Sequence, residues 1–182
     1  MDARAALLFL TAGFMAAPAC AAPERRPPVE LRVAWDYNGV PEGMKLYELK
    51  PGDWEVWTTS VVATAADAPV YREIPDATVR LRPGERKRVA LFYENTTARP
   101  VRFFAAPHSV SPARAALGFK FLCLCTNHVY VVAPGQVWYR VVELRLARDF
   151  AGKRLEIVHQ LVAVDEESAA EFREGMSRKE VP

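Results

Sequence analysis

The fold is decided by QVWYRVVELRLA at residues 136–147, followed by RLEIVHQLVAV at 154–164. Arg140-Val141 and Arg145-Leu146 show the alternation of inward and outward side chains that is typical of half-buried antiparallel strands. Pro134-Gly135, directly before the first stretch, predicts a tight turn between paired strands. Short strands joined by tight turns are therefore the expected unit of this fold.

Similar runs recur through most of the chain, interrupted by Pro, Gly and Asn, with a second Pro-Gly turn at 83–84. Eight or nine short strands with no long helix before the C-terminus are typical of two sheets packed as a sandwich. We expect an all-β fold with one β-sandwich domain at 29–164, then a short C-terminal helix and tail at 165–182. The strands are expected at 29–37, 54–64, 77–82, 86–95, 99–105, 119–125, 128–132, 136–147 and 154–164.

Composition excludes several classes of protein. The chain has 182 residues, of which 51% are hydrophobic, so it can bury a core and is not of the disordered class. A net charge of +2 without a basic run argues against nucleic acid as a partner. The cysteine count is three, which excludes a mini-protein held together by disulfides. No hydrolase motif and no phosphate-binding glycine loop is present, so an enzyme is not expected.

Residues 1–22 are expected to direct export. Ala5 to Ala22 hold no charge, and Ala19-Cys20-Ala21 fits the pattern of signal-peptide cleavage. An uncleaved membrane anchor, or a lipid attached to Cys20, would fit the same stretch. All three alternatives place the domain outside the cytoplasm, behind a proline-rich tether at 23–28.

Cys123 and Cys125 carry the chemistry that the sequence suggests. On an extended strand their side chains would point to one face, with Cα atoms ~6.5–7 Å apart, which suits one shared soft ion better than a disulfide. Thiolates select Cu(I), zinc or iron–sulfur centres, and Cu(I) is best matched to two sulfurs and little else. From this spacing alone, an inert core pair and thiol redox chemistry remain alternatives.

Gly118 to Asp149, GFKFLCLCTNHVYVVAPGQVWYRVVELRLARD, resembles the cysteine signature and following strands of the CtaG-type cytochrome c oxidase assembly proteins. Residues 80–103 and Val110-Ser111-Pro112 are similar to segments that precede the family's cysteines. The resemblance implies an immunoglobulin-like β-sandwich on the periplasmic side of the inner membrane. It further implies a copper chaperone of the respiratory chain, which takes Cu(I) from a donor protein and delivers it to the Cu(B) centre of oxidase subunit I. Members of the family can pair as a homodimer, so that copper sits between two subunits.

Residue by residue, the resemblance assigns copper binding to Cys123 and Cys125. Leu124 and Thr126 stand where the family has two phenylalanines, and Cys20 is the one counterpart of its third cysteine. These differences leave another copper enzyme open as the acceptor. Residues 29–59 take no part in the resemblance.

The three histidines are secondary candidates. His128, three residues after Cys125, is a candidate third ligand, and His108 is a weaker one in a loop that precedes the cysteines. His159 is expected to be an ordinary sheet position. The alternative function from a different class is an exported thiol redox protein that acts on partner cysteines or copper sites. A structural module with inert cysteines stands third.

Overall fold

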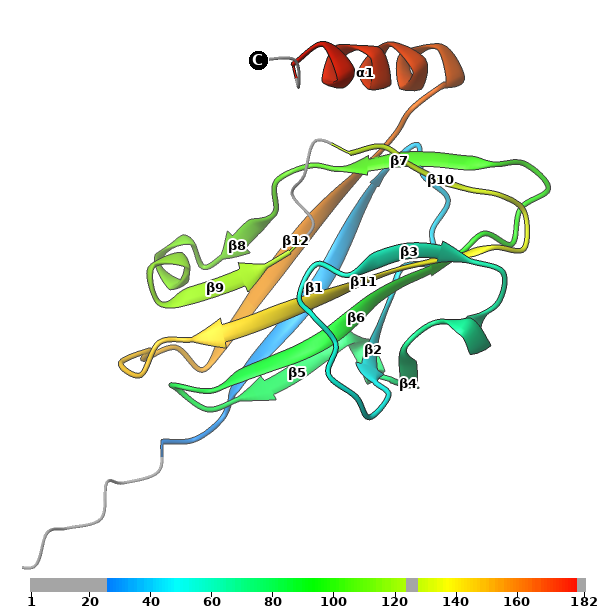
Figure 1. The fold of residues 1–182 in the computed structure, drawn as a ribbon. Helices are drawn as coiled ribbons and strands as arrows, with labels where there is room; N and C mark the ends of the chain where they lie inside the picture. Colours follow the sequence, from blue (N-terminus) through cyan, green and yellow to red (C-terminus); the bar gives the residue numbers. More distant parts are fainter. Residues whose placement is uncertain (1–25, 124–127, 180–182) are drawn as a thin grey trace, which may run out of the picture.

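The computed structural model describes residues 26–123 and 128–179, with side chains described up to Phe172. Two six-stranded sheets face each other across one core, and one α-helix follows them (Figure 1). Sheet A consists of β1 (Val29–Asn38), β5 (Thr78–Leu81), β7 (Val101–Ala105), β8 (Ser109–Ser111), β10 (Tyr130–Val132) and β12 (Arg154–Ala163). Sheet B consists of β2 (Lys45–Leu49), β3 (Thr59–Val62), β4 (Val70–Glu73), β6 (Arg86–Glu94), β9 (Phe119–Leu122) and β11 (Val137–Leu146).

The order of strands brings the two ends of the domain together. In sheet A the order is β10-β7-β12-β1-β5, with β8 also on β12, and in sheet B it is β3-β11-β6-β2-β4, with β9 also on β11. β1 and β12 run parallel over nine pairs, from Glu30 opposite Arg154 to Asn38 opposite Val162. The first and last strands thus lie side by side in the middle of sheet A (Figure 1).

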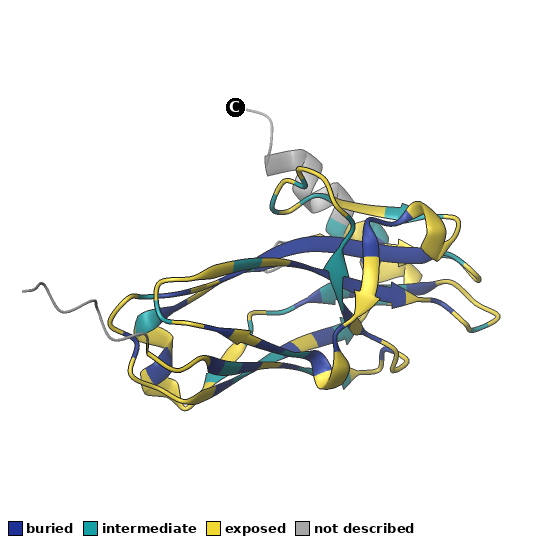
Figure 2. Cartoon of the chain, turned by 90° about the horizontal axis from the view of Figure 1, so that it is seen from below, coloured by how far each residue is buried: buried dark blue, intermediate teal, exposed yellow. Residues whose placement is uncertain are grey.

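Alternation within the strands builds the core. β12 shows it most clearly, because Leu155, Ile157, His159 and Leu161 are buried while the residues between them are at least partly accessible. Figure 2 shows the same division through the molecule, with buried segments in the strands and exposed residues in the connecting loops. β11 is buried at nine of its ten positions. It is an inner strand of sheet B, with β6 along one edge and with β3 and β9 along the other.

The C-terminal helix, α1 (Glu166–Lys179), begins as the sequence predicted. The Asp165 carboxylate accepts a hydrogen bond from the backbone N–H of Ser168 at 2.7 Å, which caps the helix N-terminus. That bond lowers the pKa of Asp165. Arg102 forms an ion pair of 3.1 Å with Glu166 and connects the helix to β7. Among the described residues, no helix has the length and apolar character needed to cross a membrane.

Three short strands were not predicted, and one predicted strand is wrong in its first half. β2, β4 and β8 hold only five, four and three residues, too few for a periodic pattern to stand out. The strand expected at 54–64 is confined to β3, because Trp57 has a φ of 74° and breaks the extended backbone. β9 ends at Leu122, so Cys123 lies just beyond the strand that was expected to continue to 125.

Both predicted Pro-Gly turns are present. The N–H of Glu85 donates to the carbonyl of Arg82 at 2.9 Å, and the N–H of Gln136 donates to that of Ala133 at 3.0 Å. Gly84 and Gly135 have φ values of 89° and 74°, which a type II turn requires after its proline. Their predicted role between paired strands was wrong, since each turn carries the chain from sheet A to sheet B.

Candidate functional site

Cys123 lies inside the sandwich, directly after β9. Phe119 and Phe121 of that strand are buried and Lys120 between them is exposed, so Cys123 continues the inward-facing series. The residue is 9% exposed. The thiol is thus sheltered, at the point where β9 stops pairing with β11.

His108 supplies the nearest polar contact to this thiol. Its Nδ1 atom lies 3.2 Å from Cys123 Sγ, within hydrogen-bonding distance for sulfur. The imidazole also packs edge-on against Phe121, with ring centroids 5.3 Å apart. His108 lies between β7 and β8, which both pair with β12, so sheet A brings it to face β9 of sheet B.

His159 joins the cluster from the inner face of β12. It is 1% exposed and lies between the buried side chains of Ile157 and Leu161. Its ring centroid is 6.0 Å from that of His108 and 5.9 Å from that of Phe121. One thiol and two imidazoles therefore lie close together in an otherwise largely apolar interior.

A buried arginine occupies the inner face of β11. Arg140 is 4% exposed, lies between the inward-facing Trp138 and Val142, and donates to the Tyr130 hydroxyl at 3.0 Å. Within residues 26–123 and 128–179, Arg140 forms no ion pair. The sandwich interior thus holds a guanidinium whose described side-chain partner is the hydroxyl group of Tyr130.

Glu143 of β11 lies opposite Leu122 of β9. It is 1% exposed, and its carboxylate accepts hydrogen bonds from Arg88, at 3.0 Å, and from Arg145. Burial alone would raise the pKa of Glu143, but the two guanidinium groups outweigh this effect and hold it below its ordinary value. This ion-paired carboxylate lies one residue along the strand pair from Cys123.

The predicted site residues do not all lie in this cluster. Cys123 is in the cluster, whereas Cys125 and Cys20 lie outside the described residues. His128 is exposed, with its ring 4.8 Å from that of Tyr130. His108, the weaker candidate in the sequence, is the histidine in contact with Cys123.

Sequence reasoning did not single out His159 as a neighbour of His108 or Arg140 as a buried charge. A signal for both was present, because each occupies an inward position in an alternating strand where an apolar residue is the norm. In the part of the chain that the structure describes, no group of three or more His, Cys, Asp or Glu is arranged to hold a metal ion.

Residues 29–164 match the family described as a domain of unknown function, DUF8709. The chain belongs to this family. The matched range runs from the first residue of β1 to the residue after β12, so the DUF8709 domain is the two-sheet sandwich without α1. None of the curated proteins matches the chain.

Proposed function

We propose that this DUF8709 protein is a copper chaperone, not an enzyme, which binds Cu(I) through Cys123 and Cys125 and hands it to a copper enzyme. The observation that supports the proposal is the sheltered contact between Cys123 Sγ and His108 Nδ1, 3.2 Å apart. The resemblance to CtaG-type proteins favours the Cu(B) centre of cytochrome c oxidase subunit I as the acceptor. It also favours an immunoglobulin-like sandwich held at the periplasmic face of the inner membrane, loaded by a copper donor protein.

The donor atoms suit Cu(I). Thiolate and imidazole are both ligands of copper, and thiolate selects the Cu(I) state. In a tetrahedral zinc site, a sulfur at 2.3 Å and a nitrogen at 2.0–2.1 Å from the metal lie about 3.6 Å apart. If the distance between Cys123 Sγ and His108 Nδ1 increased from 3.2 Å by a few tenths of an ångström, a metal ion of similar size would fit between them, with His108 as the nitrogen ligand.

The surroundings suit an ion that must be kept reduced and later given up. Phe121 and the buried wall of β12 limit access of water to Cys123. The chain leaves β9 at this residue, so the thiol lies at the end of a strand and not at its middle. Ligands of an acceptor would displace the protein's ligands one at a time at this end.

An anaerobic Cu(I) titration of the reduced full chain against a chromophoric chelator tests the proposal. We expect one copper per chain, lost in both Cys123→Ser and Cys125→Ser. His108→Ala should weaken binding about 10-fold or more, as loss of a group that orients or completes a metal site does. His128→Ala is the matched control and should bind like the wild type.

Two results would contradict the copper proposal. If the wild type took up no more copper than the two serine variants, the proposal of copper binding would be wrong. Equal weakening by His108→Ala and His128→Ala would retain copper binding but remove the role of the Cys123–His108 contact.

The same contact also supports a second candidate, a thiol redox protein. An imidazole beside a thiol can accept its proton, and the resulting thiolate attacks one sulfur of a partner's disulfide. A mixed disulfide forms with Cys123 as one partner thiolate leaves. Cys125 would then attack the Cys123 sulfur, which releases the second partner thiolate and forms a Cys123–Cys125 disulfide. The extended-strand spacing that disfavours this disulfide does not apply at Cys123, because β9 ends at Leu122. The Cys125→Ser variant should trap this mixed disulfide in metal-free buffer, which the copper proposal does not predict.

A further inference from the structure

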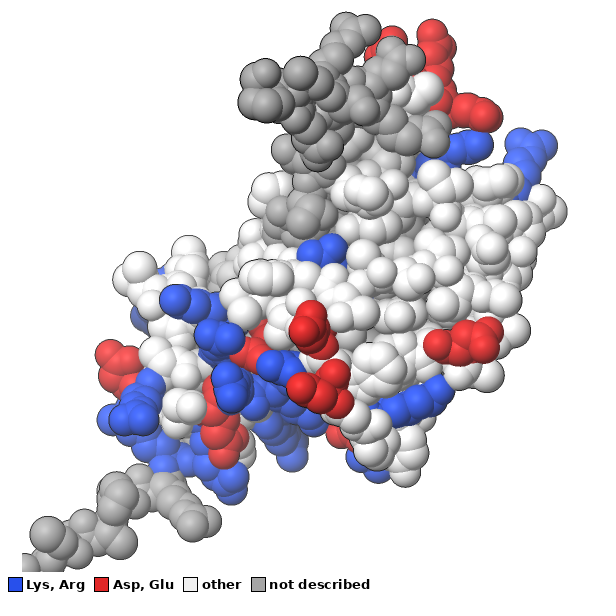
Figure 3. All heavy atoms as spheres, viewed as in Figure 1, with Lys and Arg blue, Asp and Glu red and all other residues white. Residues whose placement is uncertain are grey.

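One end of the sandwich is strongly basic. We define this basic end as residues 26–30, 80–86, 112–120 and 145–154. The segments are joined there by strand pairs and hydrogen bonds, among them Glu30 opposite Arg154 and Arg145 opposite Arg86. They contain ten Lys and Arg but three Asp and Glu, whereas the whole chain holds 24 and 22. Figure 3 shows the positive side chains gathered where the described chain begins.

Much of this charge is not neutralised by neighbours. Among the residues that the structure describes, no ion pair involves any of five exposed basic side chains at this end. These are Arg86, Arg114, Lys120, Arg148 and Lys153. Like charges kept together at an exposed surface are typical of a site that binds an anionic partner.

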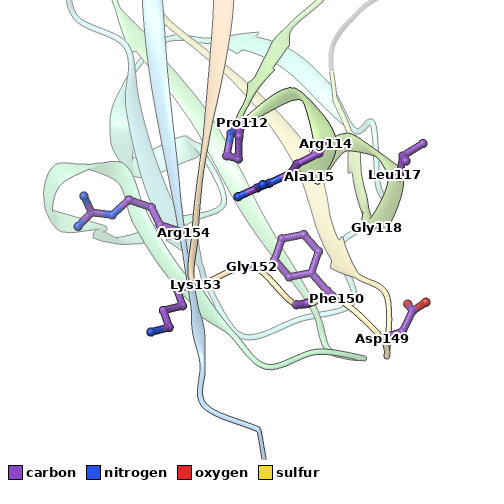
Figure 4. Close-up of a pocket in the computed structure, with 11 residues that line it drawn as sticks. Pro112, Arg114, Ala115, Leu117, Gly118, Asp149, Phe150, Gly152, Lys153 and Arg154 are labelled. Atoms are coloured by element: carbon purple, nitrogen blue, oxygen red, sulfur yellow. The ribbon is translucent and has the colours of Figure 1, made fainter.

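A pocket of ≈ 510 Å³ opens at the same end, between the short helix η3 (Ala113–Gly118) and the loop from β11 to β12. The ring of Phe150 forms one wall, and Arg114 extends across the pocket toward Arg154, the first residue of β12 (Figure 4). Leu117 points away from the pocket into solvent and is 96% exposed. A basic side chain able to bind a phosphate group, that of Arg114, and an exposed apolar side chain, that of Leu117, thus lie within a few residues of each other.

We propose that the basic end binds the surface of a bilayer containing anionic phospholipid, with headgroup phosphates at Arg114, Arg148 and Lys153 and with Leu117 entering the apolar layer. Two features favour lipid over an acidic protein. The exposed leucine beside the charges is suited to a membrane interface. The uncharged stretch 5–22 is joined to this same end by the tether at 23–28. The inference does not depend on copper binding.

The experiment measures how far lipid protects individual lysines of the full chain. The chain is bound to nanodiscs of phosphatidylcholine, or of phosphatidylcholine with 30% phosphatidylglycerol (roughly the anionic content that recruits basic surfaces), and methylated reductively before mass spectrometry. Each lysine is compared with itself in the two lipids, so attachment through residues 5–22 affects both measurements equally. We expect Lys120 and Lys153 to be protected about fivefold in the anionic discs. Lys45, in its ion pair with Glu73, should be unchanged.

Matched variants separate the basic end from net charge. Arg114→Gln with Arg148→Gln should abolish the protection, whereas Arg72→Gln with Arg99→Gln removes the same charge elsewhere and should leave it intact. Leu117→Ser should reduce the protection without altering its salt dependence. Equal methylation of Lys153 in the two lipids would overturn the proposal and leave an acidic protein as the partner to seek. Equal loss of protection in both double variants would also overturn it.

Discussion

Glu143, an ion-paired carboxylate, and Cys123, a thiol beside an imidazole, lie on opposite faces of sheet B. Glu143 lies on the outer face of β11, where Arg88 and Arg145 neutralise its buried carboxylate. Cys123 follows β9 on the inner face, where His108 provides its polar contact. A carboxylate on the inner face would lose its hydration without these guanidinium partners, at a cost of several kcal/mol. Glu143 is therefore tolerated in a buried position because its two guanidinium partners lie beside it.

The ion pairs of Glu143 should make stability depend on pH. Because its pKa is lowered on folding, the carboxylate stabilises the protein above its ordinary pKa of 4.5, and this contribution is lost as the pH falls through the lower folded pKa. Glu143→Gln should reduce the free energy of unfolding at pH 7 by about 1–3 kcal/mol. Denaturant titrations of both proteins from pH 7 downward should show the difference shrinking on acidification below 4.5.

The control for this prediction is Glu156→Gln, which removes an exposed ion pair of 2.8 Å with Arg32. That change should cost less than about 0.5 kcal/mol at any pH. A difference between wild type and Glu143→Gln that stays constant to low pH would show that Glu143 acts through packing and not through its charge.

Connections between elements decide much of this architecture. The loop from β11 to β12 holds Phe150, whose ring packs against two glycines from different segments. A Cβ on Gly118 would lie 2.9 Å from the Phe150 ring, and one on Gly152 would lie 2.6 Å from it. Gly152 has no positive φ, so the ring and not the backbone excludes a side chain there. This three-residue contact fixes the loop that forms one side of the pocket at the basic end.

Gly152→Ala should therefore destabilise the protein by about 1–3 kcal/mol, because a buried aromatic ring must move to admit one methyl group. Phe150→Leu should be destabilising alone but should relieve the crowding when combined with Gly152→Ala. Chemical denaturation of the two single variants and the double variant measures this coupling. Additive effects of the two changes would mean that the loop adjusts without contact between ring and methyl group.

At the scale of the molecule, aromatic residues join the two sheets into one cooperative unit. Phe103 of β7 in sheet A packs edge-on against Trp138 of β11 in sheet B, with centroids 5.4 Å apart, and also contacts Tyr93 of β6. Phe103 and Trp138 are fully buried. The parallel pairing of β1 with β12 adds a second constraint, since it joins the first and last strands of the domain, which are far apart in the sequence.

Phe103→Ala should lower the free energy of unfolding by about 3–5 kcal/mol, from lost burial and the cavity left between the sheets. If the core is shared, both sheets should unfold together in the variant as in the wild type. Tryptophan fluorescence, which includes Trp138 of sheet B, and far-ultraviolet circular dichroism, which follows all strands, should give the same midpoint in urea. Two separate transitions would show that the sheets are stable independently.

The sequence by itself determined where most strands lie, the two Pro-Gly turns and the start of α1. These features depend on neighbouring residues: alternation sets a strand, a proline followed by glycine sets a turn, and an acid sets a helix start. Only the tertiary structure decided which sheet each strand joined and that both turns cross between the sheets. It alone brought His108 to Cys123 and His159 to His108, and gathered four separate segments into the basic end. Such contacts arise from strand pairing between distant segments, and no local pattern in the chain encodes that choice of partner.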